Sequence, residues 1–320
     1  MARCRVDSSI TRTIVDGYEF PLGVYPVEGM KPIEGFTLHF ESAESEIPGE
    51  SDYGERSERF DALDETPDEM SFESGEDEFN PDESSSSGAG GDRRRPGPGE
   101  RGEGLEPTPW PDRYVFDINI RSSRVESLCR QLFALLPGRV YPIIDVMGND
   151  GYREIDPFIA YDLVGIERFL DAVRRYRSWF FEDGLVGFGA MSEEPFIYLF
   201  IDEHKIVTVR VRAEDKDKVE KILRAFDLQE VETIAGADAA VHEHRGVLDA
   251  PSNRPDLLSH DEIVEELRDS WGLSLNIDPM TNVDENNQDL GIVVWRCVVR
   301  VFDTGGQVRY AEVFASADSY

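Results

Sequence analysis

The sequence predicts an α+β fold, a mostly antiparallel sheet covered by helices and preceded by a long acidic disordered linker. Short segments of alternating or continuous apolar residues, typical of strands, stand between segments whose apolar residues recur at i, i+3, i+4 and i+7, as in amphipathic helices. Several neighbouring strand segments are separated only by short polar turns, which favours antiparallel pairing. Both patterns are missing between residues 41 and 112, so this stretch is predicted to connect rather than to fold.

The negative charge of the chain is concentrated in the predicted linker. The 320 residues carry a formal net charge of −33, and residues 41–92 alone contain 19 Asp and Glu residues against two Arg. A stretch with so few apolar side chains cannot bury enough surface to offset the chain entropy lost on folding. We therefore expect residues 41–112 to be a disordered acidic tether.

The charge and the cysteine pattern also restrict partners and environment. A strongly negative chain repels nucleic-acid phosphates and anionic membranes, so neither is expected as a partner; a protein partner with a basic surface is compatible. The three cysteines are widely scattered and form no CxxC pair, and the N-terminal residues lack the apolar core of a secretory signal. These features favour the reducing environment of the cytoplasm.

Residues 1–40 are a short aromatic-containing segment ahead of the tether. The segment is rich in Tyr and Phe, has Gly or Pro every few positions, and favours a short strand at 37–40. A piece this small cannot bury a core alone. We expect it to dock on the later domain; the alternative is a partner-binding segment that becomes ordered on contact.

Residues 113–234 are predicted to form an α+β domain. Its first helix is expected to begin at a capping box of Ser123 and Glu126, in which each side chain bonds to the backbone of the other residue. The predicted elements are a strand at 114–120, a helix at 124–136, a strand at 140–146, a loop at 147–157, a helix at 163–182, a strand at 185–191, a hairpin of 196–201 and 206–211, a helix at 214–227 and a strand at 230–234.

Residues 235–320 are predicted to add a helix and a C-terminal β-hairpin, packed on the same domain. A second capping box, Ser259 with Glu262, opens the helix. The hairpin is indicated by strict alternation of apolar residues and by a turn with two glycines. The predicted elements are a polar loop at 235–258, a helix that ends at Gly272, a strand at 273–277, and hairpin strands on either side of a turn at 303–306.

The sequence offers one candidate metal site, in and after the predicted polar loop. Imidazole and carboxylate groups are good ligands for transition metals. In an extended segment His242 and His244 would point the same way because side chains alternate, and His260 or Asp261 could complete the set. The alternative is a solvated loop that binds nothing. A divalent metal is the only cofactor that the residues suggest.

Two further clusters of charged residues carry weaker signals. Carboxylates after the second predicted strand of the domain could bind a cation or a small ligand or act in acid–base chemistry, although Asp and its Asn and Gly neighbours are also ordinary turn residues. A basic run in the long helix could be an interaction surface or a solvated face. The carboxylates are Asp145, Asp150, Glu154 and Asp156, and the basic residues are Arg174, Arg175 and Arg177.

Two functional hypotheses from different classes result. The first is a non-catalytic intracellular interaction or regulatory protein, in which the acidic tether carries the N-terminal segment and the protein partner is unknown. The second is a metal-dependent hydrolase that uses His242, His244 and His260. The first hypothesis is favoured by the lopsided charge of the chain and by aromatic residues at 18–40 that lack a core of their own. The sequence contains no phosphate-binding glycine loop and no GxSxG nucleophile motif.

Overall fold

The computed structural model describes residues 3–43, 110–147, 155–249, 254 and 256–276, together with the backbone of two strands at 293–302 and 308–317. The predicted disordered tether therefore lies, from residue 44 to residue 109, outside the described residues. The candidate site residues Asp150 and Glu154 also lie outside them.

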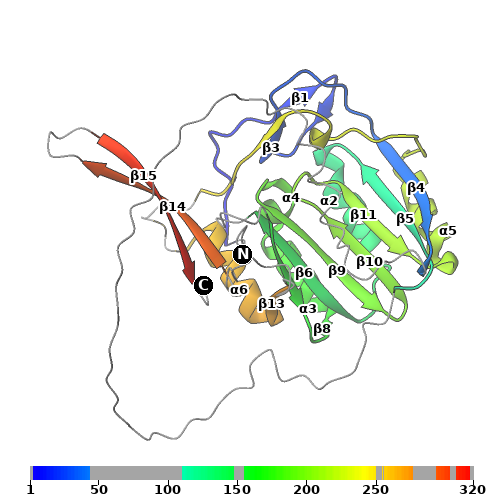
Figure 1. Cartoon of the computed structure of the whole chain (residues 1–320). Helices are drawn as coiled ribbons and strands as arrows, with labels where there is room; N and C mark the ends of the chain where they lie inside the picture. Colours follow the sequence, from blue (N-terminus) through cyan, green and yellow to red (C-terminus); the bar gives the residue numbers. More distant parts are fainter. Residues whose placement is uncertain are drawn as a thin grey trace, which may run out of the picture. The chain divides into compact units, whose positions relative to one another are not determined.

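An antiparallel sheet is the centre of the fold, which confirms the predicted α+β class (Figure 1). Within the described residues this sheet has nine strands, and all its strand pairings are antiparallel. In spatial order the strands are β13 (Leu273–Leu275), β7 (Ile155–Ala160), β6 (Arg139–Met147), β9 (Val186–Glu193), β10 (Phe196–Ile201), β11 (Val207–Val211), β5 (Arg113–Asn119) and β4 (Gly35–Glu41), with β8 (Val164–Gly165) paired to β6.

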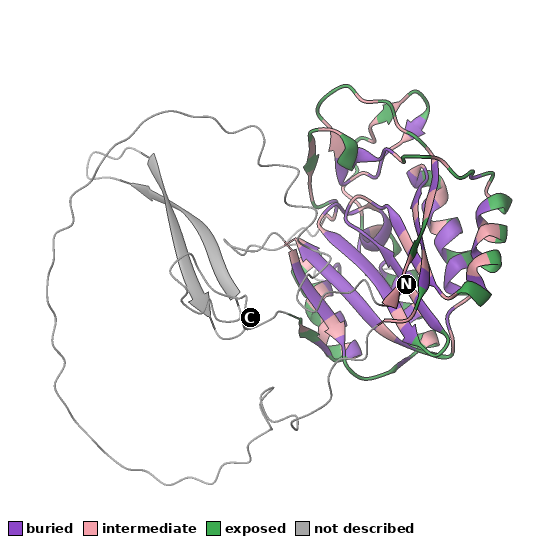
Figure 2. Ribbon diagram, turned by 45° about the vertical axis from the view of Figure 1, so that its right-hand side comes forward, coloured by how far each residue is buried: buried purple, intermediate pink, exposed green. Residues whose placement is uncertain are grey.

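One face of this sheet forms the hydrophobic core. Because side chains alternate along each strand, a row of directly paired residues crosses the sheet on a single face. The row is buried in one cluster with the apolar stripes of the helices, so the helices cover this face (Figure 2). Truncating one such side chain to Ala would cost about 2–5 kcal/mol. The row consists of Phe158, Ile144, Phe188, Ile201, Val207, Ile118 and Phe36.

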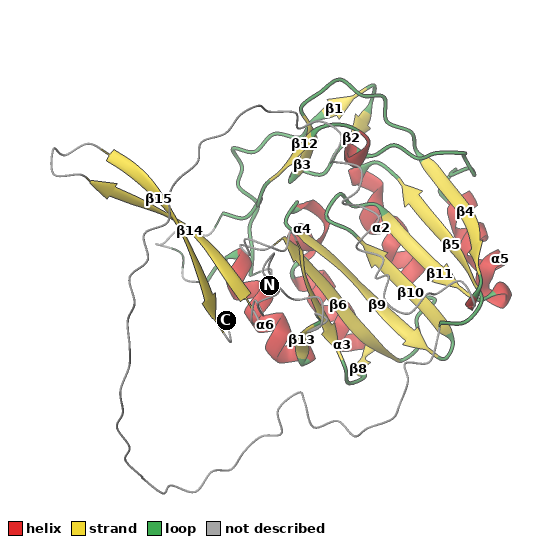
Figure 3. Ribbon diagram, viewed as in Figure 1, coloured by secondary structure: helices red, strands yellow, loops and turns green. Residues whose placement is uncertain are grey.

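Of the two predicted capping boxes, the one at Ser259 is confirmed and the one at Ser123 is wrong. At the start of α6 the Ser259 hydroxyl accepts the Glu262 N–H at 3.3 Å, and the Glu262 carboxylate accepts the Ser259 N–H at 2.8 Å. The predicted box at Ser123 is wrong, because α2 begins two residues earlier than predicted, with Arg121 at the cap position and no side-chain cap bond. The helices are α2 (Ser122–Phe133), α3 (Ile166–Arg175), α4 (Arg177–Glu182), α5 (Ala213–Ala225) and α6 (His260–Trp271) (Figure 3).

The long helix predicted at 163–182 is interrupted at Tyr176, which separates α3 from α4. Trp179, Phe180 and Phe181 are three consecutive residues, and all three are buried. Consecutive residues are about 100° apart around a helix, so a straight amphipathic helix with one covered face cannot bury all three. All three lie within α4, so this short helix is covered on more than one side.

Two other predictions about local structure were wrong. The predicted loop at 147–157 ends early, because β7 begins at Ile155 and pairs with β6. The strand predicted at 230–234 is reduced to one isolated bridge between Glu230 and Phe36. In both places the neighbouring strand accounts for the difference. Five residues of β7 pair with β6, whereas residues 230–234 form a single bridge to β4, at Phe36.

The N-terminal segment is part of the same body as the sheet. Its β4 pairs with β5 along seven residues. Residues 3–27, which we call the N-terminal ribbon, run antiparallel to residues 241–249, as in the bond from Val27 N–H to Val241 O at 2.9 Å, and Arg3 O accepts the Leu258 N–H at 2.8 Å. The ribbon contains β1 (Ile14–Val15), β2 (Tyr18–Glu19) and β3 (Val24–Pro26), and β3 pairs with β12 (His242–His244).

The polar stretch at 235–258 is therefore not the plain loop that the sequence predicts. It contains a short 3-10 helix, η2 (Ala237–Ala239), and the strand β12. The predicted C-terminal hairpin is confirmed at the level of the backbone, as β14 (Val293–Phe302) pairs with β15 (Val308–Ala317). In the part of the chain that the structure describes, no helix has the length and apolar character required to cross a bilayer.

Candidate metal centre

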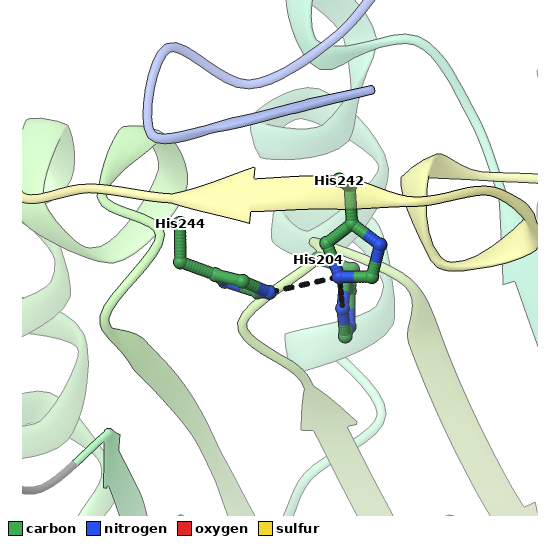
Figure 4. Close-up of side chains that lie close together, drawn as sticks. All are labelled: His204, His242 and His244. Atoms are coloured by element: carbon green, nitrogen blue, oxygen red, sulfur yellow. Dashed lines mark hydrogen bonds between the residues drawn. The ribbon is translucent and has the colours of Figure 1, made fainter. Parts of the chain in front are cut away.

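Three histidines from two parts of the chain meet at one point (Figure 4). His242 and His244 project from the same side of β12, and His204 approaches them from the turn between β10 and β11. The Nε2 atom of His242 lies 2.9 Å from Nε2 of His204 and 3.0 Å from Nε2 of His244. One nitrogen from each ring therefore converges on the same small volume.

The pairing of β12 orients two of these rings. His242 and His244 are two residues apart on a strand, so their side chains leave the same face. The register with β3 places His242 opposite Pro26 and His244 opposite Val24. This pairing makes the local backbone extended, which the predicted geometry of the two histidines requires.

The third ring comes from an unusually buried hairpin turn. Asp202, Glu203 and Lys205 expose only 3%, 6% and 2% of their surface. Hairpin turns usually lie in solvent, and burying ionisable groups is costly unless they are paired. Here Lys205 donates to Val186 O at 2.6 Å and takes the left-handed conformation with φ 69, while the Asp202 carboxylate accepts the Ile206 N–H at 2.8 Å.

An oxygen acceptor holds the Nδ1 atom of each ring. Nδ1 of His242 lies 2.7 Å from Ala240 O, and Nδ1 of His244 lies 2.8 Å from Gly184 O. Nδ1 of His204 lies 3.1 Å from the Glu203 carboxylate and 3.5 Å from that of Asp202. Metal-binding histidines are typically oriented in this way, with the far ring nitrogen bonded to a carboxylate or a backbone carbonyl.

The carbonyl partners determine which nitrogen carries the proton in two of the rings. A carbonyl oxygen can only accept a hydrogen bond, so Nδ1 of His242 and Nδ1 of His244 must be protonated. In the neutral ring the Nε2 atom then presents its lone pair. When both rings are neutral, the Nε2 atoms of His242 and His244, which lie 3.0 Å apart, both present lone pairs.

The charges around the site differ among the histidines. Burial opposes protonation of His204, but the Asp202 and Glu203 carboxylates outweigh it and raise the pKa of His204 to about 10. Burial, followed by the charge of the neighbouring His204, lowers the pKa of His244 to about 4. Protonated His204 can donate to Nε2 of His242 at 2.9 Å. A cation bound by all three rings would take the place of this proton, so binding would release it.

A contact between two glycines positions the ribbon beside the site. A Cβ atom at Gly184 would lie 2.0 Å from Gly23 O, and one at Gly23 would lie 2.0 Å from Gly184 N. The Gly184 N–H donates to Arg245 O at 3.1 Å, and the Arg245 N–H donates to Gly23 O at 2.8 Å. This close approach places Gly184 O within reach of His244.

Comparisons with protein family models, with curated proteins and with solved structures found no match to this chain.

The structure brings together two of the four predicted metal ligands and separates the others from them. Among the described residues, the group around His242 and His244 is completed by His204, not by His260 or Asp261. His260 lies at the start of α6, where its Nδ1 accepts the Trp179 indole N–H at 3.0 Å. Asp261 occupies the first turn of the same helix.

His204 was not predicted to belong to this group, although the residues around it are unusual. The residues 202–205 are Asp-Glu-His-Lys, a wholly ionisable turn between two apolar strands. Such a turn predicts a hairpin, and nothing in its spacing relates it to a histidine pair 38 residues later. The relation follows only from the path of the chain after α5.

The other predicted clusters are also located by the structure. Asp145 on β6 pairs with Pro157, and Val146 pairs with Asp156 on β7, so the two buried carboxylates point to opposite faces of the sheet. Asp145 and Asp156 therefore do not form one site. The three helix arginines each form an ion pair within the chain: Arg174 with Asp171, Arg175 with Glu266, and Arg177 with Glu126.

Proposed function

We propose that this protein binds a transition-metal ion, with zinc as the best-suited ion, through Nε2 of His204, His242 and His244. The observation that carries the proposal is that three Nε2 atoms converge while each Nδ1 is held by an oxygen acceptor. Imidazole nitrogen suits zinc, and the acceptors fix the rings in the orientation for binding.

Two of the three spacings among these nitrogens are close to what a tetrahedral zinc ion requires. With Zn–N bonds of about 2.0–2.1 Å, neighbouring ligand nitrogens lie about 3.3 Å apart. The two Nε2 pairs at 2.9 and 3.0 Å would need to separate by only a few tenths of an ångström. Small rotations of rings that are only partly buried supply such a movement.

A metal-dependent hydrolase is the second candidate function. It is supported by the three-ligand set, because three imidazoles leave one position of a tetrahedral ion for water. Zinc bound in this way lowers the pKa of its water to about 7 and so generates a nucleophile. His204, rather than His260, would supply the third ligand. The Glu203 carboxylate would act by orienting His204 and making it a stronger donor.

The interaction hypothesis stays a proposal that the sequence supports. The acidic stretch at 41–92 favours attraction to a basic protein partner in the cytoplasm, and metal binding is compatible with a regulatory role. The two proposals concern different parts of the chain and can be tested separately.

The experiment is a zinc titration of the full chain, purified without an affinity tag and stripped with a chelator. Isothermal titration calorimetry should give one zinc per chain. The variants His204→Ala, His242→Ala and His244→Ala should each bind far more weakly. Glu203→Gln should weaken binding by about 10- to 100-fold, the usual effect of losing a partner of a ligand.

His39→Ala is the matched control, because His39 is a half-exposed histidine on β4 outside the group. It should bind zinc like the wild type. If the wild type takes up no zinc, or if His242→Ala binds as tightly as the wild type, the proposed function is wrong. Zinc-dependent hydrolysis of an activated ester that is lost in His242→Ala would favour the hydrolase over a purely structural site.

A further inference from the structure

The proposed metal ligands lie on both sides of a boundary within the fold. His242 and His244 belong to β12, which pairs with β3 of the N-terminal ribbon. His204 belongs to the hairpin turn between β10 and β11 in the middle of the main sheet. An ion held by all three would therefore connect the β3–β12 pair to the main sheet.

The end of α4 provides another attachment of the ribbon near this point. The Glu182 carboxylate accepts from Arg12 at 2.7 Å, and Glu182 O accepts the Gly23 N–H at 2.7 Å. The Asp183 carboxylate accepts the Val247 N–H at 2.9 Å. These contacts hold the ribbon on one side of β12, and the histidine cluster lies where β12 meets the hairpin turn.

The histidine cluster lies where β12 meets the hairpin turn. Without a cation, a hydrogen bond of 2.9 Å between Nε2 of His204 and Nε2 of His242 joins the two elements at this point. A cation bound by all three Nε2 atoms would add His244 to this connection and would hold β12 and the hairpin turn through ligand bonds from both.

We propose that metal occupancy controls how firmly the N-terminal ribbon and β12 are docked on the sheet, so that the site acts as a metal-dependent clasp. This inference rests on the proposed metal binding and adds its regulatory consequence. Because an ion that binds only the docked state stabilises it by mass action, the docked population follows the free metal concentration. The main sheet, whose core lies on its helix-covered face, stays folded in both states.

Hydrogen–deuterium exchange of the full chain tests the clasp, with zinc as the probe. The reporters are amides whose hydrogen bonds join the ribbon and the residues after β12 to the end of α4 and the two residues that follow it: Leu22, Gly23, Gly184 and Val247. At zinc about 100-fold above its Kd, their exchange should slow by about 100-fold relative to chelator-treated protein, if opening releases the ion. Amides within β6, β9 and β10 should exchange at the same rate in both conditions.

Two variants separate the clasp from general loosening of the ribbon. Arg12→Gln removes the ion pair with Glu182 and should speed exchange of the reporters, with and without zinc, while the zinc-dependent slowing is retained. His204→Ala removes the ligand on the sheet side and should abolish the slowing. Circular dichroism and exchange in β10 show whether each variant is folded.

The outcomes distinguish the clasp from the metal site itself. If zinc binds at one per chain but the reporters exchange equally fast with and without it, the clasp is wrong and metal binding stands. If zinc slows the reporters and the sheet amides equally, the ribbon is not a separately released unit and the clasp is again wrong. If no zinc binds, the proposed function fails and the clasp fails with it.

Discussion

Replacement of Gly184 by Ala should weaken both the fold and the metal site, because Gly184 joins them. The added Cβ would lie 2.0 Å from Gly23 O, whereas ordinary contact begins at 3.4 Å. The two backbones must therefore separate by about 1.4 Å, the difference of these distances. Backbone on both sides leaves no flexible side chain to yield.

The cost can be worked from the bonds at this junction. Three backbone hydrogen bonds are affected: Gly23 N–H to Glu182 O at 2.7 Å, Arg245 N–H to Gly23 O at 2.8 Å, and Gly184 N–H to Arg245 O at 3.1 Å. A separation of more than 1 Å breaks hydrogen-bond geometry, and each bond contributes about 0.5–1.5 kcal/mol. The free energy of unfolding should fall by about 2–4 kcal/mol. The displaced Gly184 O would no longer accept the hydrogen bond from Nδ1 of His244, so zinc affinity should fall by about 10- to 100-fold.

Urea denaturation followed by circular dichroism measures the first effect, and zinc titration calorimetry measures the second. Gly138→Ala is the matched control, since a Cβ at Gly138 would meet nothing within 4 Å. Its free energy of unfolding should stay the same or rise by up to about 1 kcal/mol, because Ala restricts the unfolded chain. A Gly184→Ala protein as stable as Gly138→Ala would refute the reasoning about the glycine junction.

Two further predictions concern the attachment of the N-terminal segment. Buried Asn119 accepts a hydrogen bond from the Tyr18 hydroxyl at 2.6 Å and donates to Ile33 O and Ala235 O at 2.9 and 2.8 Å. In urea denaturation, Asn119→Ala should lower the free energy of unfolding by at least about 2 kcal/mol. The control Asn276→Ala, at an exposed position, should lower it by about 0.5 kcal/mol or less. Hydrogen bonds and charge from Arg121 hold the pKa of Glu34 below its ordinary value. The ion pair therefore contributes its full stability above the ordinary pKa of Glu34, and this contribution is lost as the pH falls through the lowered pKa. Glu34→Gln should therefore lower stability at neutral pH and flatten its acid dependence; an unchanged slope would count against the pair.

Local patterns predicted much of the fold because neighbouring residues determine them. The hairpin of β10 and β11 and the helix α5 were located from apolar periodicity, and the capping box at Ser259 was read directly from two side chains three residues apart. Long-range contact decided the exceptions. Three adjacent buried aromatic residues interrupted the predicted long helix, and β6 extended β7 into a predicted loop.

The candidate site shows the same division. The spacing of His242 and His244 was sufficient to predict that they share a face, because alternation is a local property of extended backbone. It was not sufficient to place a third ligand. His260 is nearer in the sequence but bonds to Trp179, whereas His204 is 38 residues before His242 and meets it.

By itself, then, the sequence determined the class of the fold, the order of most elements and the common face of His242 and His244. These depend on side-chain periodicity and on hydrogen bonds between residues a few positions apart. Only the tertiary structure decided that the N-terminal ribbon pairs with β12 and that a buried hairpin turn lies beside it. The physical reason is that contacts between distant segments depend on which strand edges remain open after the core has formed.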